Sequence, residues 1–208
     1  MPKLTQSQRE ALRVQTPLAR LSYPHLFKKA EPMTAGDTPK FQCELIFPES
    51  ADLSKLEEAL ELAKSIWWPS RKGSVKWPIK DGDTRRDRET DEIRDGYEFS
   101  KFISPRSEDQ PGIVIGPDRR TVTDPTEIYG GGYVIADLSA YGYEMQTGDG
   151  VTFALNNIWW IRGGEPFTSR RSAEEAFADT DVDDSMFEED AYGGDDEGPA
   201  IDDDDDLL

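Results

Sequence analysis

Cysteine and histidine are almost absent from this chain of 208 residues. Cys43 is the only cysteine and His25 is the only histidine. A lone thiol excludes an internal disulfide and a thiolate metal cluster, and it fits a reducing cytosol. Zinc sites and the usual Ser/His or Cys/His catalytic pairs would all have to include His25. We therefore expect no metal ion, no other cofactor and no enzymatic activity.

Long apolar runs are also missing. Hydrophobic residues make up 36% of the chain, and no run of them approaches the roughly 18 residues that cross a membrane. We therefore expect no membrane partner.

Basic residues are missing from the last 35 positions. Residues 174–208 contain 17 of the 43 acidic residues and no Lys or Arg, so 26 acidic residues accompany all 24 basic ones in residues 1–173. A segment with this much self-repulsion and so little apolar surface is predicted to be a disordered acidic tail. The body is nearly neutral, and the low isoelectric point of the whole chain does not argue against a polyanionic ligand.

Two leucines follow five aspartates at the end of this tail. A segment that only keeps a protein soluble has no need of an apolar tip. The pattern predicts binding to a basic surface with a small apolar pocket, either on the protein itself or on a partner protein. The residues that would make this contact are Asp202, Asp203, Asp204, Asp205, Asp206, Leu207 and Leu208.

The body shows the two-residue period of β-strands over most of its length. Strands are expected at residues 17–23, 40–47, 97–103, 112–116, 132–143 and 151–162. One helix is expected where Leu53, Leu56, Leu60 and Ala63 form a single stripe, with Asp52 as its N-cap and Pro69 after its end. Residues 1–13 are expected to be flexible, and residues 24–39 and 70–96 to be loops.

This order of elements predicts a mainly β protein. Two strands, a helix and four further strands with Gly-rich turns fit an OB-fold-like antiparallel five-stranded barrel over residues 14–173, with extra strands and loops. A flat α+β sheet is the alternative.

Aromatic and basic residues alternate on several predicted strands, as single-stranded nucleic acid binding requires. Bases stack on aromatic rings, and phosphates need Lys or Arg nearby. The alternative for each single ring is a place in the core. The candidate residues on the strands are Tyr97, Phe99, Lys101, Tyr141, Tyr143, Trp160 and Arg162.

The predicted loop at residues 70–96 could bind phosphates along a strand, although its mixed charge also fits an ordinary solvated loop. Its candidates are Arg71, Lys72, Lys76, Trp77, Lys80, Arg85 and Arg86, and Arg119 and Arg120 form a similar basic pair at a predicted hairpin tip. Carboxylates for a two-metal nuclease are available at Asp81, Asp83, Asp137 and Asp149, but their spacing is more typical of turns.

Residues 150–167, which read GVTFALNNIWWIRGGEPF, continue to AEEAF at 173–177. Together with PIKDGD at 78–83 and YGGGYVIADLSAYGY at 129–143, they resemble the DUF2815 family of phage-encoded single-stranded DNA-binding proteins. The resemblance spans residues 14–177. It implies an OB-fold that binds single strands during phage replication or recombination, in the cytoplasm of the infected bacterial host. The tail resembles the acidic tails of other single-strand binders, which recruit polymerases, helicases or nucleases but usually end in Phe rather than in Leu207-Leu208.

The sequence therefore predicts a protein that coats single-stranded DNA and binds duplex DNA weakly. Its tail would compete with DNA and recruit replication or recombination proteins. The alternatives are a metal-dependent nuclease, a recombination or annealing factor of another fold, an acidic DNA mimic, and an adaptor protein without DNA affinity.

Overall fold

The computed structural model describes residues 2–32, 37–71, 73–167, 177 and 180. The chain divides into two units, Met1–Ser169 and Arg170–Leu208, and every helix and strand given below belongs to the first. The predicted tail contacts at Asp202–Leu208 and the candidate Lys72 lie outside the described residues.

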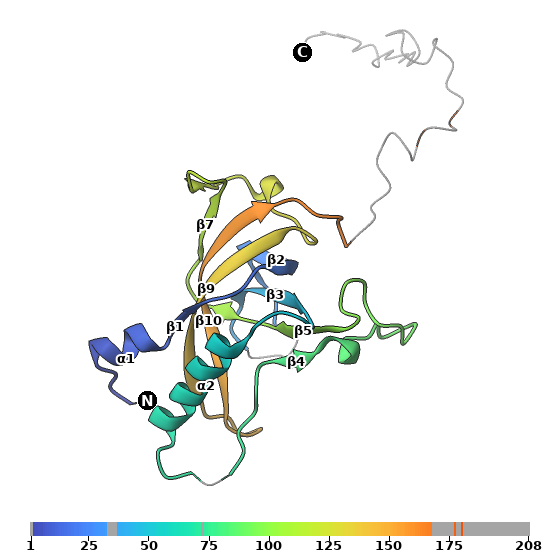
Figure 1. The fold of residues 1–208 in the computed structure, drawn as a ribbon. Helices are drawn as coiled ribbons and strands as arrows, with labels where there is room; N and C mark the ends of the chain where they lie inside the picture. Colours follow the sequence, from blue (N-terminus) through green and yellow to red (C-terminus); the bar gives the residue numbers. More distant parts are fainter. Residues whose placement is uncertain (1, 33–36, 72, 168–176, 178–179, 181–208) are drawn as a thin grey trace, which may run out of the picture. The chain divides into compact units, whose positions relative to one another are not determined.

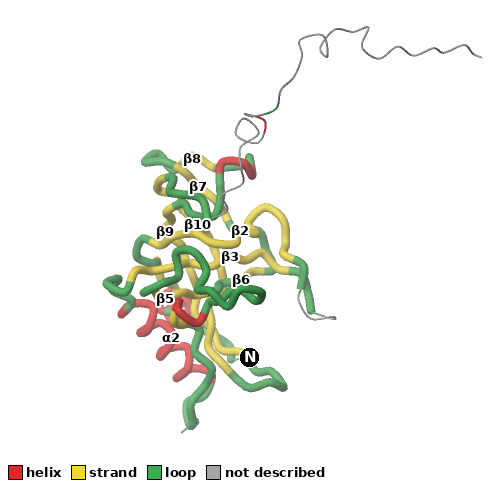
Figure 2. The backbone as a smooth tube through the Cα atoms, turned by 90° about the vertical axis from the view of Figure 1, so that its right-hand side faces the viewer, coloured by secondary structure: helices red, strands yellow, loops and turns green. Residues whose placement is uncertain are grey.

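Hydrogen-bonded strands form a closed ring, and Figures 1 and 2 label its strands. The ring runs from β9 (Tyr133–Tyr143) to β2 (Ala19–Ala30), β3 (Lys40–Pro48), β6 (Arg106–Ser107) and β10 (Gly150–Arg162), and β10 pairs with β9 again. The mainly β prediction is confirmed. The pairings differ from the expected antiparallel pattern at β10, which runs parallel to both β6 and β7 (Gly112–Ile115).

Shorter strands extend this ring. They are β1 (Arg13–Gln15), β4 (Lys80–Asp81), β5 (Ser100–Ile103) and β8 (Arg120–Thr121). β1 pairs with β9, β5 pairs with β3 and β4, and β8 pairs with β7. In both Figure 1 and Figure 2 the β7–β8 hairpin and the long helix α2 (Ser54–Trp67) lie at opposite ends of the folded unit.

The long hairpin of β9 and β10 supplies one wall of the core. Inward residues alternate along β9, and along β10 as far as Leu155. A register shift between Leu155 and Asn157 then changes which residues of β10 face inward. Ile158 and Trp160 are buried after the shift, and Trp159 faces outward.

The predicted helix is present as α2, and its apolar stripe of Leu56, Ala59, Leu60 and Ala63 is buried in the main core. Its N-cap is Leu53 rather than Asp52. The Asp52 carboxylate nevertheless accepts a hydrogen bond from the Ser54 amide at 3.0 Å. The residue before the N-cap therefore satisfies one free N–H of the first turn.

Two segments expected to lack regular structure contain it. Within residues 1–13, a capping box between Thr5 and Gln8 starts the short helix α1 (Gln6–Ala11). β2 continues through Pro24 into the predicted loop, because Pro24 lies at a register shift between Ser22 and His25. A missing amide hydrogen is tolerated at such a position.

The long loop at residues 82–98 covers part of the outer face of β3 and β5. Within the described residues, two short 3-10 helices lie at Gly82–Thr84 and Pro125–Glu127. Ile46, Tyr97 and Phe102 form a second buried cluster under this loop, with Ile93 and Phe167 packed against it. The loop therefore has a core of its own, and the rest of the β2–β3 outer face stays open.

We predict that Gly132→Ala destabilises the protein, because a Cβ at this position would lie 1.9 Å from Cη2 of the buried Trp160. Overpacking of this kind costs about 1–3 kcal/mol. The measurement is the free energy of unfolding in urea. Gly73→Ala is the control, since its nearest neighbouring atom would be 3.9 Å away. Equal stability of the two variants would mean that Trp160 does not pack beneath the start of β9.

A second prediction concerns Asp137, which joins β1 to β9. Its carboxylate accepts hydrogen bonds from Arg13 Nη2 at 2.5 Å and from Asn157 Nδ2 at 2.7 Å. Burial raises the pKa of Asp137, but these hydrogen bonds outweigh burial and leave the pKa below its ordinary value of 3.8. The carboxylate therefore stabilises the fold above its ordinary pKa, and this contribution is lost as the pH falls through the lowered pKa.

Asp137→Asn should cost roughly 1 kcal/mol near neutral pH, a modest value because Arg13 is half exposed and solvent screens the pair. The variant should also lose less stability than the wild type on acidification, measured by urea unfolding between about pH 6 and about pH 2. Glu58→Gln, which removes an exposed carboxylate on α2, is the control. A wild-type pH dependence in Asp137→Asn would contradict this role.

Candidate nucleic-acid interface

A groove of about 540 Å³ lies on the outer face of β2, β3 and β6. We call it the β2–β3 groove. Strand alternation creates it, because Cys43 and Leu45 of β3 point inward while Gln42 and Glu44 point outward. Its lining includes Tyr23, His25, Lys28, Lys29, Gln42, Glu44, Arg85, Ser104 and Arg106.

The β2–β3 groove carries an excess of positive charge. Its cations are Lys28, Lys29, Arg85 and Arg106, and its acidic residues are Glu31 and Glu44. Lys29 Nζ also lies 5.4 Å from the centre of the Phe41 ring. The sequence as a whole is acidic, so this local excess of cations is a property of the fold.

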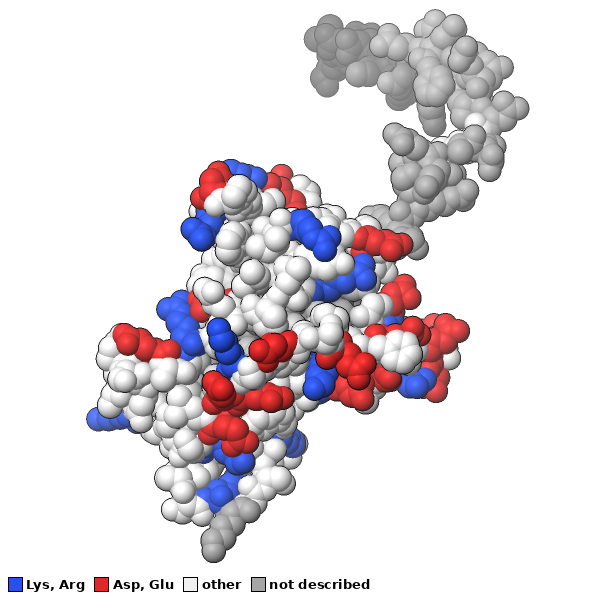
Figure 3. Space-filling model, viewed as in Figure 1, with Lys and Arg blue, Asp and Glu red and all other residues white. Residues whose placement is uncertain are grey.

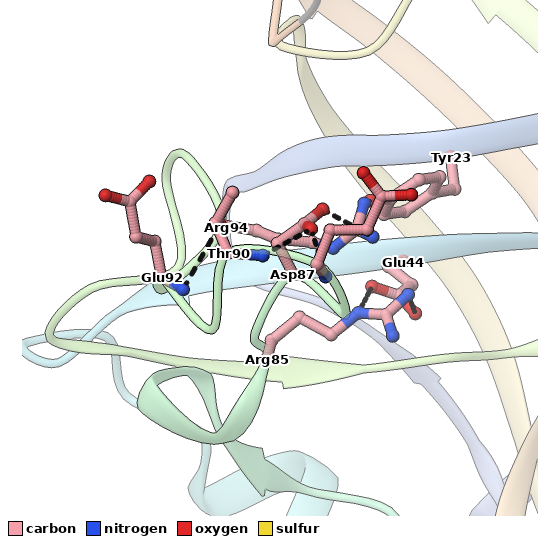
Figure 4. Close-up of polar contacts among 8 residues, drawn as sticks. Tyr23, Glu44, Arg85, Asp87, Thr90, Glu92 and Arg94 are labelled. Carbon is pink, nitrogen blue, oxygen red and sulfur yellow. Dashed lines mark hydrogen bonds and ion pairs between the residues drawn. The ribbon is translucent and has the colours of Figure 1, made fainter.

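Tyr23 lies at one end of the groove under two guanidinium groups. The Cζ atoms of Arg85 and Arg94 lie 5.2 Å and 5.6 Å from its ring centre, and Arg94 also donates a hydrogen bond to its hydroxyl. Figure 4 shows Arg94 beside Tyr23 and Asp87. The backbone of Tyr23 has a φ of 45°, a costly conformation for an aromatic residue, and 37% of the residue is exposed.

Glu44 holds Arg85 in place at the groove floor. Arg85 Nε and Nη2 approach the two Glu44 carboxylate oxygens at 3.1 Å and 3.0 Å, as Figure 4 shows. Tyr97 donates its hydroxyl hydrogen to the same carboxylate. Burial, followed by this hydrogen bond to Glu44, raises the pKa of Tyr97 well above its ordinary value. These contacts of the Arg85 guanidinium and the Tyr97 hydroxyl therefore anchor the loop at residues 82–98 to β3.

The outer face of β9 and β10 carries a second group of stacked cations. Arg162 Cζ lies 3.7 Å from the ring centre of Tyr133, and Arg119 Cζ lies 4.8 Å from a ring centre of Trp159. Trp159 Nε1 donates to the Gly116 carbonyl oxygen at 3.0 Å, which fixes the indole against the β7–β8 hairpin.

Two of the predicted stacking residues are in the interior. Tyr97 is 1% exposed and Trp160 is 4% exposed, so both rings pack in the protein and neither is open to a base. Tyr97 precedes β5 and is covered by its own loop, so it does not share a strand face with Lys101. Trp160 faces inward because of the register shift after Leu155, and a second register shift between Trp160 and Arg162 places Arg162 on a different face.

The other predicted aromatic residues are accessible in different places. Phe99 is 75% exposed and has a φ of 50°, and Lys101 is exposed on β5. Tyr141 and Tyr143 share the outer face of β9 as expected. Burial raises the pKa of Tyr141, and the charge of Arg106 opposes this shift. Arg106, a cation of the β2–β3 groove, pairs with Ala154 of β10, two residues along that strand from Thr152, the partner of Tyr141.

Most arginines of the predicted phosphate-binding loop are paired with carboxylates. Arg71 contacts Asp149 at 2.5 Å, Arg86 contacts Asp91 at 4.0 Å, and Arg120 of the hairpin contacts Glu127 at 2.5 Å. These placements favour the mixed-charge alternative for those residues. Arg85 is also paired, with Glu44, and it is the candidate of this loop that lines the groove. Figure 3 likewise shows acidic and basic side chains interspersed on the face that it presents.

The remaining candidates of that loop have structural roles near the core. The Lys76 backbone pairs with the β9–β10 turn, and Trp77 packs against the main core. Lys80 Nζ lies 5.8 Å from the ring centre of Phe102.

Sequence reasoning missed Tyr23, His25, Lys28, Lys29 and Arg106 in the groove, and Trp159 on β10. The run from Tyr23 to Lys29 does mix aromatic and basic residues, but Pro24 indicated a loop instead of a strand. For Trp159 the sequence contains no signal of the register shift that exposes it.

The four carboxylates considered for a metal centre have other partners. The Asp81 and Asp83 carboxylates accept hydrogen bonds from backbone amides. Asp137 binds Arg13 and Asn157, and Asp149 pairs with Arg71. Within the described part of the chain, no group of three or more His, Cys, Asp or Glu side chains is placed to hold a metal ion. None of the described helices is long and apolar enough to cross a membrane.

Comparison with solved structures supports the same architecture. The chain matches the structure of the single-stranded DNA-binding protein from bacteriophage Enc34 in complex with ssDNA, with a TM-score of 0.62 and 23% identity. The match covers 81% of this chain and 98% of the other. The single-stranded DNA-binding protein gp2.5 of bacteriophage T7 matches with a TM-score of 0.50 and 12% identity, over 77% of this chain and 97% of the other. At these identities the likeness concerns the fold.

Sequence comparison gives the family. Protein p50 of Acyrthosiphon pisum secondary endosymbiont phage 1 is 23% identical over 164 residues, which cover 72% of this chain and 83% of that protein. The sequence model of the family described as "Enterobacter phage Enc34, ssDNA-binding protein" matches residues 12–187. The predicted resemblance to phage single-stranded DNA-binding proteins is thereby confirmed. Since the matched region covers most of the sequence, this chain belongs to the family of the Enterobacter phage Enc34 ssDNA-binding protein.

Proposed function

We propose that this protein binds single-stranded DNA in the β2–β3 groove, in the cytoplasm of an infected bacterial host. The observation that carries the proposal is the cationic lining of this groove beside the exposed Tyr23 ring. Membership of a phage ssDNA-binding family supports it, as does the fold shared with a relative that was solved with ssDNA.

The strand ring supports an OB-fold barrel built from β2, β3, the β5–β6 segment, β9 and β10. OB-folds bind oligonucleotides on the face of their second and third strands, between the loops that join strands one to two and four to five. In this chain that face belongs to β3 and the β5–β6 segment. The flanking segments are the β2–β3 connection, described at residues 31–32 and 37–39, and the loop at residues 144–149. The β2–β3 groove lies on the same face.

In this proposal Tyr23 and Tyr141 offer ring faces to bases, at roughly 1–3 kcal/mol per stacked base. Lys28, Lys29 and Arg106 contact phosphates. Duplex DNA binds more weakly, because its bases are stacked on one another and cannot reach these rings. Residues 14–173 form the DNA-binding domain.

Residues 174–208 act as a competing tail. A tethered segment has an effective concentration on the order of millimolar near its own protein, so its aspartates occupy the basic groove when DNA is absent. DNA displaces the tail and frees Leu207 and Leu208 to recruit replication or recombination proteins.

We predict that Lys28→Gln, Lys29→Gln and Arg106→Gln together weaken the binding of oligo(dT). Each phosphate contact to a single strand contributes about −0.7 to the slope of log K against log salt, so the triple variant should lose about 2 from the magnitude of that slope. Fluorescence anisotropy of labelled oligo(dT) at several salt concentrations measures both the affinity and the slope.

The control changes Lys55 and Lys64 of α2 to Gln, since both lie on this helix, outside the lining of the β2–β3 groove, and Lys64 pairs with Glu61. An unchanged slope in the triple variant, or an equal change in the control, would show that the groove does not hold the DNA. If the wild-type protein does not bind oligo(dT) at low salt, the proposed function itself is wrong.

Removal of residues 174–208 should tighten oligo(dT) binding at low salt, and the gain should fade as salt screens the tail. The truncated protein should also fail to capture replication proteins from infected cells. Leu207→Ala with Leu208→Ala keeps all aspartates, so this variant should bind DNA like the wild type but lose its partners. Equal DNA affinity with and without the tail at low salt would rule out competition.

A further inference from the structure

We infer that bound DNA continues beyond the β2–β3 groove onto the outer face of β9 and β10, and reaches a second stacking site at Trp159 and Arg119. This inference rests on the proposed function. It adds a separate section of the DNA path and predicts a longer binding site than the groove alone provides.

A series of cations stacked on rings lies between the two places, and the Gly96 backbone and the β9–β10 register join its separate stacks. We call it the arginine–aromatic belt. In order from the groove it contains Tyr23, Arg94, Phe167, Arg20, Tyr133, Arg162, Trp159 and Arg119.

The belt leaves the groove at Tyr23 and crosses to the start of β2. Arg94 stacks on Tyr23, and the Phe167 ring packs on the backbone of Gly96, two residues after Arg94. The Cζ of Arg20 then lies 4.3 Å from the ring centre of Phe167 and 6.0 Å from that of Tyr133.

On β9 and β10 the belt follows the sheet register. Tyr133 pairs with Arg162, and the neighbouring outward residue Ile135 pairs with Trp159. Trp159 in turn pairs with Val114 of β7, so the last section crosses three strands in one row. Tyr133 and Ile135 lie two residues apart on β9, whereas Trp159 and Arg162 lie three apart on β10, because a second register shift falls between Trp160 and Arg162. The two stacking pairs therefore occupy neighbouring rows of the same face.

The arginines of this far section keep their charge available. Arg20 donates to the backbone carbonyls of Gly131 and Glu165, at 3.2 Å and 2.7 Å. Within the described residues, no carboxylate lies within 4.0 Å of the guanidinium groups of Arg20, Arg119 or Arg162, whereas Arg13 and Arg120 are both paired. A guanidinium that lies on a ring still carries a full positive charge, so these three are suited to phosphates.

The end of the belt is also hollowed. A groove of about 610 Å³ runs across β1, β9, β10 and β7, with Val14, Ile135, Trp159 and Val114 among its lining residues. Asn157 and Arg119 also line it. An aromatic and apolar floor with hydrogen-bonding groups beside it suits an unpaired base. Arg119 is exposed above the half-buried Trp159, so a base would stack on the outer face of its guanidinium.

The test compares the lengths of DNA that each part of the path can hold. Oligo(dT) of about 4 and about 16 nucleotides spans the range occupied by single OB-folds. Arg119→Asn, which tolerates the φ of 55° at this position, and Trp159→Leu are measured separately. Each should weaken binding of the longer oligonucleotide about tenfold, the effect of one stacked base, and leave the shorter one unchanged.

Lys64→Gln on α2 is the control for a general loss of positive charge, and thermal unfolding checks that each variant is folded. The groove variant with Lys28→Gln and Lys29→Gln should lose affinity at both lengths. If Arg119→Asn and Trp159→Leu weaken both lengths equally, or neither, the belt does not extend the DNA path. That result leaves the proposed function intact, since only a wild-type protein that binds neither oligonucleotide would overturn it.

Discussion

The pairing of β9 with β10 is the constraint on which the rest of the structure depends. β9 also pairs with β1 and β2, and β10 also pairs with β6 and β7, so one hairpin joins both halves of the ring. Its inner face packs in the same core as α2 and β3. β1, β2, β6 and β7 are each positioned by their register on this hairpin. A slip of one residue in the register of either strand would move its inward residues to the outside.

One irregularity in this register decides which aromatic side chain is available on the surface. Strict alternation from Val151 would bury Trp159 and expose Trp160. The shift after Leu155 reverses them, so Trp160 fills the core against Gly132 and Trp159 holds Arg119 on the outer face. A single extra residue in a strand therefore separates a packing role from a surface role for two adjacent tryptophans.

The charges of the body are best understood through what each cation contacts. Arginines that lie beside carboxylates, such as Arg71, Arg86 and Arg120, add little field at the surface because their charge is locally neutralised. Arginines that lie on rings, such as Arg20, Arg119 and Arg162, keep theirs. A nearly neutral body can thus present local positive surfaces, and its net charge does not report them.

The sequence by itself determined the mainly β class, the single long helix and the family, because two-residue alternation, the stripe from Leu56 to Ala63 and the segment at 150–167 are local patterns. It also offered Tyr141, Arg85, Arg119 and Arg162 as candidates, and these four residues lie along the DNA path proposed above. Only the tertiary structure decided that Tyr97 and Trp160 are buried, that Arg71 and Arg120 are paired, and that Tyr23, Lys28 and Lys29 line a groove with Arg106. Burial, ion pairing and grooves arise between residues far apart in the chain, so no local sequence pattern predicts them. A register shift is fixed by the neighbouring strands, so it does not appear as a change of period in the sequence either.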